Sequence, residues 1–252
     1  MKSASILNTR WSLSLALALV LVIPVAQADM SKSEREQLDR LQRDVQILKR
    51  QVDELSRKQP ETALQAAPEK TSAFSLGTNP TMGSKDAKIA FIEFSDYQCP
   101  YCTRFHEKTF DRLKSKYIDS GKVLYAYRDL PSPSRPQAVK AAIAARCAGA
   151  QDKYFDMQKV LFKNATQLRD DSYAKLAKKL GLDLDKFESC MIDNNQLENV
   201  EQDLVDGRAL GVRGTPTFFI GTIEGNKVIS ASRIVGALPY NFFKQSLDKA
   251  LK

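Results

Sequence analysis

The feature that most constrains this chain is a Cys-x-x-Cys pair placed where a strand is expected to end and a helix to begin. Residues 88–95 combine aromatic and β-branched side chains between polar neighbours, and this pattern predicts a buried strand. The motif Cys99-Pro100-Tyr101-Cys102 follows it and opens a segment of helical periodicity. Because two cysteines at this spacing share one face of a first helical turn, they can form a disulfide without rearranging the backbone.

The chemistry predicted for this pair is thiol–disulfide exchange. Pro100 suits the first helical turn, since its missing N–H would have had no partner there. Cys99 is then expected among free backbone N–H groups at the positive end of the helix dipole, which stabilise a thiolate and lower its pKa. We expect Cys99 to be the attacking sulfur and the more shielded Cys102 to be the resolving thiol.

A zinc site and an inert structural motif are the alternatives for the same cysteines. Structural zinc needs four ligands, usually including a second Cys-x-x-Cys or a Cys/His pair at short spacing. The chain has four cysteines and one histidine, His106, and its sequence holds no second Cys-x-x-Cys. We expect no metal, and no cofactor beyond the redox-active disulfide Cys99–Cys102. His106 follows Cys102 by one helical turn, and we expect it on the helix surface; a contact with the site is the alternative.

The first 28 residues have the pattern of a cleaved secretory signal peptide. Two cationic residues, Lys2 and Arg10, come before an apolar stretch at residues 11–25, and residues 26–28 read Ala-Gln-Ala. The stretch is shorter than the ~20 residues that a spanning helix needs, although an uncleaved membrane anchor is the alternative. We therefore expect localisation to the periplasm, an oxidising compartment where disulfides persist.

Residues 31–58 carry the pattern of a coiled-coil-like oligomerisation helix. Apolar residues alternate at spacings of three and four, at Leu38, Leu41, Val45, Leu48, Val52 and Leu55. This narrow stripe is typical of a coiled-coil seam, and valine at position a with leucine at position d favours a parallel homodimer, with a trimer left open. Docking on the chain's own domain and binding of a different protein are the alternatives. Residues 59–73, which include Pro60 and Pro68, are predicted to be a linker.

A second motif, Gly214-Thr215-Pro216, opens a β-prone segment. Taken alone it predicts an ordinary trans proline before a strand, because cis X–Pro bonds are a small minority. A strand, a Cys-x-x-Cys helix, a long helical region and a Thr-Pro dipeptide before a strand together resemble the DsbA-like branch of the thioredoxin superfamily, over residues 74–252. The resemblance implies an α/β thioredoxin fold with an inserted all-helical domain.

The resemblance also implies a substrate-binding surface. Pro216 would be a cis-proline beside the cysteine sulfurs and Thr215 the selectivity residue before it, and their backbone would pair with an extended client segment, as in strand addition. Pro100 and Tyr101 complete this predicted set. The Pro-Tyr dipeptide is typical of glutaredoxins, whereas DsbA itself usually has Pro-His, so the sequence does not predict the redox potential.

Glu93 matches the family's buried acidic residue near the resolving cysteine. It lies on the predicted strand 88–95, six residues before Cys99. The resemblance implies that Glu93 accepts the proton of the resolving thiol. The alternative is an outward-pointing surface glutamate.

Between the two motifs the sequence predicts a strand at 121–128 and then a helical insertion at 136–210. The expected helices span 138–148, 152–163, 171–180 and 185–210, and a last strand at 228–235 and a closing helix at 240–251 follow the second motif. Cys147 and Cys190 fall on different predicted helices. With Cys99 joined to Cys102, only this intramolecular pairing remains, and we predict a structural disulfide. Two buried free thiols are the alternative.

The charge is +8 but is scattered along the chain, which is poor evidence for nucleic-acid binding, and we expect none. The sequence predicts a periplasmic thiol:disulfide interchange protein that oxidises or isomerises disulfides. Its expected partners are unfolded or misfolded exported proteins, a membrane redox partner and a second copy of itself. The alternative is a non-catalytic periplasmic chaperone, or a protein that binds Cu(I) through the same thiols. Clients and the net direction of exchange are not predicted.

Overall fold

A computed structural model describes residues 31–58, 70–77 and 79–252, which fall into two units divided near residue 66. The predicted signal peptide (1–28) and most of the predicted linker (59–69) lie outside the described residues. Within the described ranges, no helix has the length and apolar composition needed to cross a membrane.

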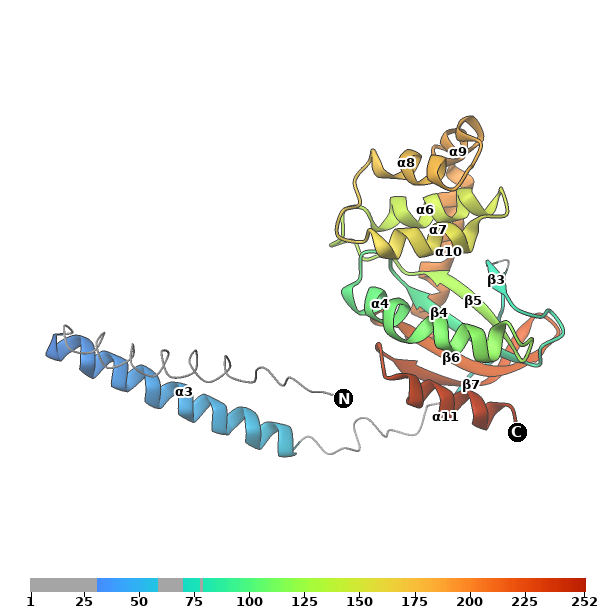
Figure 1. Cartoon of the computed structure of the whole chain (residues 1–252). Helices are drawn as coiled ribbons and strands as arrows, with labels where there is room; N and C mark the ends of the chain where they lie inside the picture. Colours follow the sequence, from blue (N-terminus) through green and yellow to red (C-terminus); the bar gives the residue numbers. More distant parts are fainter. Residues whose placement is uncertain (1–30, 59–69, 78) are drawn as a thin grey trace, which may run out of the picture. The chain divides into compact units, whose positions relative to one another are not determined.

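The first unit contributes the helix α3 (Lys32–Lys58; Figure 1). A capping box begins it: the Ser31 N–H donates to the Glu34 carboxylate at 2.8 Å, and the Ser31 hydroxyl accepts from the Glu34 N–H at 3.3 Å. Three residues of the apolar stripe predicted as a seam are exposed on α3: Leu41 at 62%, Val45 at 48% and Leu48 at 58% of their full accessibility. The predicted arm is therefore helical over the described residues.

The second unit is built on a seven-stranded sheet in the order β1-β7-β6-β4-β5-β3, with β2 also paired to β7. The central strand β4 runs parallel to β5 and antiparallel to β6. The bounds are β1 (Lys70–Thr71), β2 (Phe74–Ser75), β3 (Thr81–Met82), β4 (Ile89–Ser95), β5 (Val123–Asp129), β6 (Thr217–Glu224) and β7 (Lys227–Val235). The predicted linker is shorter than expected, because Lys70 and Thr71 pair with β7.

Strand β4 is central because both of its faces are apolar. On one face, the Phe91 ring packs against Phe105, Phe218 and Phe243. On the other face, Phe94 packs against Phe219. The first face is covered by one bent helix and the closing helix, which share a single core cluster (Figure 1). The bent helix comprises α4 (Pro100–Phe105), η2 (His106–Phe110), α5 (Asp111–Leu113) and η3 (Lys114–Ile118), and the closing helix is α11 (Tyr240–Ala250).

The inserted region is all-helical, as predicted, with α8 and α9 farthest from the sheet (Figure 1). Its helices are α6 (Ala138–Gly149), α7 (Tyr154–Lys163), α8 (Ser172–Lys179), α9 (Leu184–Met191) and α10 (Asn194–Ala209). The prediction of a single helix at 185–210 is wrong, because one helix ends at Met191 and another begins at Asn194. Asp193 adopts extended backbone angles there, and its carboxylate accepts from the Asn195 N–H, which starts α10 afresh.

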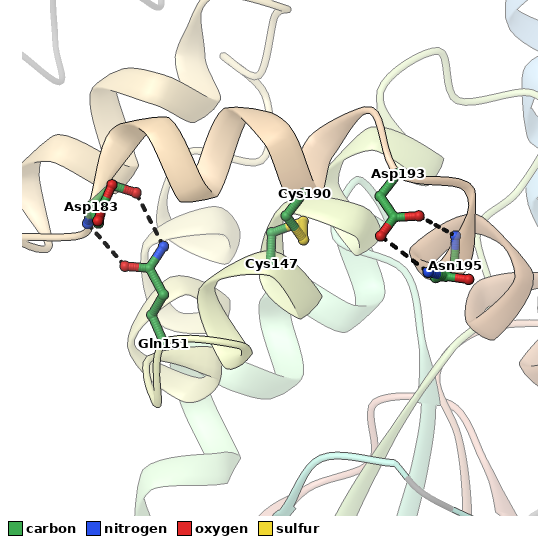
Figure 2. Close-up of a disulfide and its surroundings, with 6 residues drawn as sticks. All are labelled: Cys147, Gln151, Asp183, Cys190, Asp193 and Asn195. Carbon is green, nitrogen blue, oxygen red and sulfur yellow. Dashed lines mark hydrogen bonds between the residues drawn. A yellow bond between two sulfur atoms is a disulfide. The ribbon is translucent and has the colours of Figure 1, made fainter.

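A disulfide joins Cys147 of α6 to Cys190 of α9, with Cα atoms 5.6 Å apart (Figure 2). This is the predicted pair. A second link between the same regions lies nearby: the Gln151 side chain accepts from the Asp183 N–H at 2.9 Å and donates to the Asp183 carbonyl at 3.1 Å. The outer helices are thus tied to α6 by one covalent and two polar connections.

Candidate active site

The Cys-x-x-Cys motif lies where β4 ends and α4 begins. Cys99 is the N-cap of α4, with extended backbone angles (φ −78°, ψ 120°), and Pro100 occupies the first helical position. Both sulfurs are shielded, with Cys99 1% and Cys102 0% exposed as residues. The strand-to-helix turn therefore places Cys99 at the edge of the core and Cys102 one step further inside.

The second motif lies directly beside Cys99. The Thr215–Pro216 peptide bond is cis, and the Thr215 carbonyl oxygen lies 3.3 Å from Cys99 Sγ, which donates to it in the thiol form. The Pro216 carbonyl accepts from the Gly236 N–H at 2.8 Å, so β7 holds this turn in place. Cys99 and Thr215 are 116 residues apart in the sequence, and their contact joins the two motifs into one site.

The two cysteines have opposite acidities. A hydrogen bond from Cys102, together with the Thr215 side chain and the N–H groups of Cys102 and Tyr101, lowers the pKa of Cys99 to about 5 against the opposing effect of burial. Burial raises the pKa of Cys102 far above its usual range, and the hydrogen bond to Cys99 and the negative charges of Cys99 and Glu93 raise it further. At neutral pH the pair thus holds a thiolate at Cys99 and a thiol at Cys102.

Glu93 is fully buried on β4, so the alternative of a surface glutamate is wrong. Its carboxylate accepts a 2.7 Å hydrogen bond from the Tyr125 hydroxyl on β5. It also lies 3.1 and 3.2 Å from Nε2 of His106. Tyr125 and His106 therefore hold the Glu93 carboxylate in place, and its negative charge contributes to the raised pKa of Cys102.

The prediction that His106 lies on the helix surface is wrong. Its side chain is 9% exposed, and its ring stacks on Phe162 of α7 with centroids 4.0 Å apart. The signal was present in the sequence: His106 is one turn beyond Cys102, and residues at this spacing share a face of the helix. The helix face that carries Cys102 packs against the sheet. Because His106 lies on the same face, its side chain contacts Glu93 of β4.

Sequence reasoning also missed an ion pair beneath the motif. The buried Asp96 carboxylate accepts from Arg135 at 2.7 Å, from the Ser132 N–H at 2.8 Å and from the Gln98 N–H at 2.7 Å. These bonds tie the residues just before Cys99 to the loop after β5. The Asp-x-Gln spacing is the local signal for the bond within the turn, but no local pattern indicates the ion pair with Arg135.

Of the other predicted substrate-binding residues, Tyr101 is 57% exposed beside the buried cysteines, and Pro100 is also exposed. The guanidinium carbon of Arg104 lies 4.9 Å from the centre of the Tyr101 ring. An aromatic surface with a cationic neighbour therefore adjoins the site.

Comparison with known proteins agrees with this geometry. Residues 75–238 match the family described as Thioredoxin, and the chain belongs to that family. Among solved structures, alpha-DsbA1 from Wolbachia pipientis is 27% identical with a TM-score of 0.62, covering 69% of this chain and 92% of that one. BdbD from Bacillus subtilis, in its oxidised form, is 21% identical with a TM-score of 0.62, covering 72% and 97%, and shows the shared fold. The chain is a DsbA-like member of the thioredoxin superfamily.

Sequence relatives divide into two kinds. A putative protein-disulfide oxidoreductase from Rickettsia bellii is 27% identical over 149 residues, which is 57% of each protein. The Na(+)/H(+) antiporter NhaA 3 from Salinispora tropica is 32% identical over 139 residues, 55% of this chain and 21% of the antiporter. The chain therefore spans only about a fifth of the antiporter's length.

Proposed function

We propose that this protein is an exported thiol:disulfide oxidoreductase that acts on folding client proteins. One observation carries the proposal: Cys99 caps α4 beside the cis Thr215–Pro216 bond, with a lowered pKa, while the adjacent Cys102 is buried and remains a thiol. An acidic attacking sulfur next to a shielded resolving sulfur is the arrangement that disulfide exchange requires.

The exchange proceeds through a mixed disulfide. In oxidation, a client thiolate attacks Cys99 in the disulfide form, the Cys99–Cys102 bond breaks, and Cys102 leaves and takes up a proton. A second client thiolate then attacks the client sulfur of the mixed disulfide and releases Cys99 as a thiolate. The low pKa of Cys99 makes it a good leaving group in this last step. In isomerisation, the Cys99 thiolate attacks a client disulfide and is later released by a different client thiol.

Clients are proposed to bind as extended segments along Thr215 and Pro216, with Tyr101 as an exposed aromatic contact. A cysteine within such a segment is thereby brought to the Cys99 sulfur, which lies 3.3 Å from the Thr215 carbonyl. The proposed location is the periplasm, and the proposed recharging partner is a membrane redox protein.

The exposed stripe of α3 supports self-association through a coiled coil, with a dimer favoured. An oligomer holds two or more sites around one client and hinders access by an oxidase that would recharge a monomer. We therefore propose mixed activity, with isomerisation alongside oxidation.

The test is the refolding of ribonuclease from its reduced form and from a scrambled, disulfide-mispaired form. The protein is expected to accelerate both reactions, and Cys99→Ser is expected to abolish both. Retained rates in the Cys99→Ser variant would contradict the proposal and favour a non-catalytic chaperone, which does not need the thiolate. A form lacking residues 31–58 is expected to lose isomerisation and keep oxidation.

A further inference from the structure

The buried acid beside the resolving cysteine has two side-chain partners among the residues that the structure describes. Glu93 is 0% exposed, and its carboxylate contacts the Tyr125 hydroxyl and His106. Tyr125 is itself fully buried, and burial followed by the Glu93 charge raises its pKa well above its usual range, so its hydroxyl stays protonated. Of the two side chains that the structure places on the Glu93 carboxylate, the imidazole of His106 is the one with a second ring nitrogen through which a proton can be passed on.

His106 reaches from Glu93 to a cavity between η2 and α7. The cavity has a volume of about 580 Å³, and His106 is part of its wall. Its mouth carries the exposed side chains of Glu107, Lys159 and Lys163, which place it in contact with solvent. Nε2 of the ring faces Glu93, and none of the described residues forms a hydrogen bond with Nδ1.

A second buried group points to water at the inner end of this cavity. Gln158 of α7 is 2% exposed and lines the same wall. Its amide nitrogen is a buried donor without an acceptor among the residues that the structure describes. Buried donors in folded proteins are nearly always satisfied by protein or ordered water, and a cavity of this size readily holds water molecules.

We propose that His106 is the positioning and proton-relay residue of this site, linking Glu93 to water in the cavity; the inference rests on the proposed exchange function. When Cys102 attacks a mixed disulfide, its proton passes to Glu93, Glu93 passes one to Nε2 of His106, and Nδ1–H releases one to water. The Cys102 sulfur bonds to Cys99 as the Cys99–client bond breaks, and the client leaves as a thiolate.

The opposite half-reaction runs the same route inward. A client thiolate breaks the Cys99–Cys102 bond; Nδ1 of His106 takes a proton from water in the cavity, Nε2–H gives one to Glu93, and Glu93 passes it to the departing Cys102 thiolate. Since one proton leaves and one enters per cycle, the ring returns to its starting tautomer each time. The stack on Phe162 keeps the ring oriented while it changes protonation state.

The reaction of the reduced protein with dithiobis(nitrobenzoate) separates the two cysteines. Attack by Cys99 releases the first nitrothiobenzoate, and resolution by Cys102 releases the second. His106→Ala is expected to leave the first phase unchanged and to slow the second on the order of tenfold or more, the scale of general acid–base assistance. Added imidazole, which fits the space left by the ring, is expected to restore the second phase.

Two further variants make the test decisive. His106→Phe keeps an aromatic ring on Phe162 but has no ring nitrogen, so its second phase should be slow and insensitive to imidazole. Met82→Ala enlarges the same cavity without touching the Glu93–His106 pair, and both of its phases should match the unaltered protein. A normal second phase in His106→Ala, or a slow one that imidazole leaves unchanged, would overturn the relay. Absence of a fast first phase in the unaltered protein would instead contradict the exchange function.

Discussion

At the scale of single residues, the acidity of Cys99 is the property on which exchange depends. Its pKa of about 5 has the hydrogen bond from Cys102 as its largest cause. The ultraviolet absorbance of the thiolate, followed against pH in the reduced protein, is expected to change with a midpoint near this value. Cys102→Ala removes the hydrogen bond and should move the midpoint upward. A midpoint above neutrality in the unaltered protein would contradict the proposed chemistry.

The same acidity makes the stability of the reduced protein depend on pH. The folded pKa of about 5 lies below the unfolded value of about 8.5, so the thiolate stabilises the fold above the unfolded pKa. That contribution grows as the pH rises above the folded pKa and disappears as the pH falls through it. Urea unfolding should therefore show that the reduced, unaltered protein is more stable than the Cys99→Ser variant near pH 8. The difference in unfolding free energy between the two proteins should vanish near pH 4.

Residue identities at the site were predictable to different degrees. Cys99, Cys102 and Pro216 lie in short motifs whose spacing carries the chemistry, so the sequence indicated them directly. Glu93 required the resemblance, because a glutamate in an apolar strand has no local signal for its partner. His106 shares a helix face with Cys102, which the spacing indicates, but its contact with Glu93 follows only from the packing of that face on β4.

At the scale of elements, the Cys147–Cys190 disulfide fixes α9 to α6. Closing a loop of this length stabilises a fold by about 3–4 kcal/mol in the chain-entropy treatment. The double variant Cys147→Ala/Cys190→Ala should lose stability on this scale in urea unfolding while keeping thiol exchange at Cys99. Adding a reductant that opens both disulfides should lower the unfolding free energy of the unaltered protein toward that of the double variant. Equal stability of the two oxidised proteins would contradict a structural role.

A buried ion-pair network joins α10 to β5 and α6. The Asp203 carboxylate, 1% exposed, accepts from Arg128 at 2.7 Å, from Arg146 at 2.6 Å and from the Asp129 N–H at 2.9 Å. Asp203→Asn removes the carboxylate that the two buried guanidinium groups share, and each keeps one carboxylate partner, Asp206 for Arg128 and Asp129 for Arg146. The loss of these charge-assisted hydrogen bonds should cost about 1–3 kcal/mol of unfolding free energy.

The matched control for that variant is Asp170→Asn, which breaks the ion pair between Asp170 and Lys140. The Lys140 side chain is 51% exposed and the Asp170 side chain is 69% exposed. Exposed pairs contribute about 0–1 kcal/mol, so its unfolding curve should barely move. Similar losses in the two variants would mean that burial adds nothing to the Asp203 network.

Element boundaries followed the sequence where periodicity was long. The strand at 88–95 and the closing helix were predicted within about two residues, the usual uncertainty at element ends. The break between α9 and α10 coincides with four consecutive polar residues, 193–196, and the prediction missed it because Asp193 was not recognised as the N-cap of a new helix. Strand β1 has two residues, too few for an alternating pattern, and exists only through its pairing with β7.

At the scale of the whole molecule, the remaining question is what covers α3. A helix of this composition is marginal alone in water, so its stripe favours a partner. The helix offers an internal comparison: Leu48 is on the predicted seam at position d, whereas its neighbour Ile47 is at position c, off the seam. The two side chains are 58% and 53% exposed in the single chain, so burial within the protomer does not distinguish them.

Leu48→Asp is expected to dissociate the proposed oligomer, because a carboxylate buried in the proposed coiled-coil seam has no compensating charge. Ile47→Asp makes the same change of polarity one residue away and should leave the assembly intact. Sedimentation equilibrium measures the two masses, and refolding of scrambled ribonuclease measures the consequence: Leu48→Asp should lose isomerisation while retaining oxidation, and Ile47→Asp should keep both. If both variants dissociate, or neither does, the predicted heptad register is wrong. If Leu48→Asp is monomeric yet isomerises normally, the arm does not set the direction of exchange.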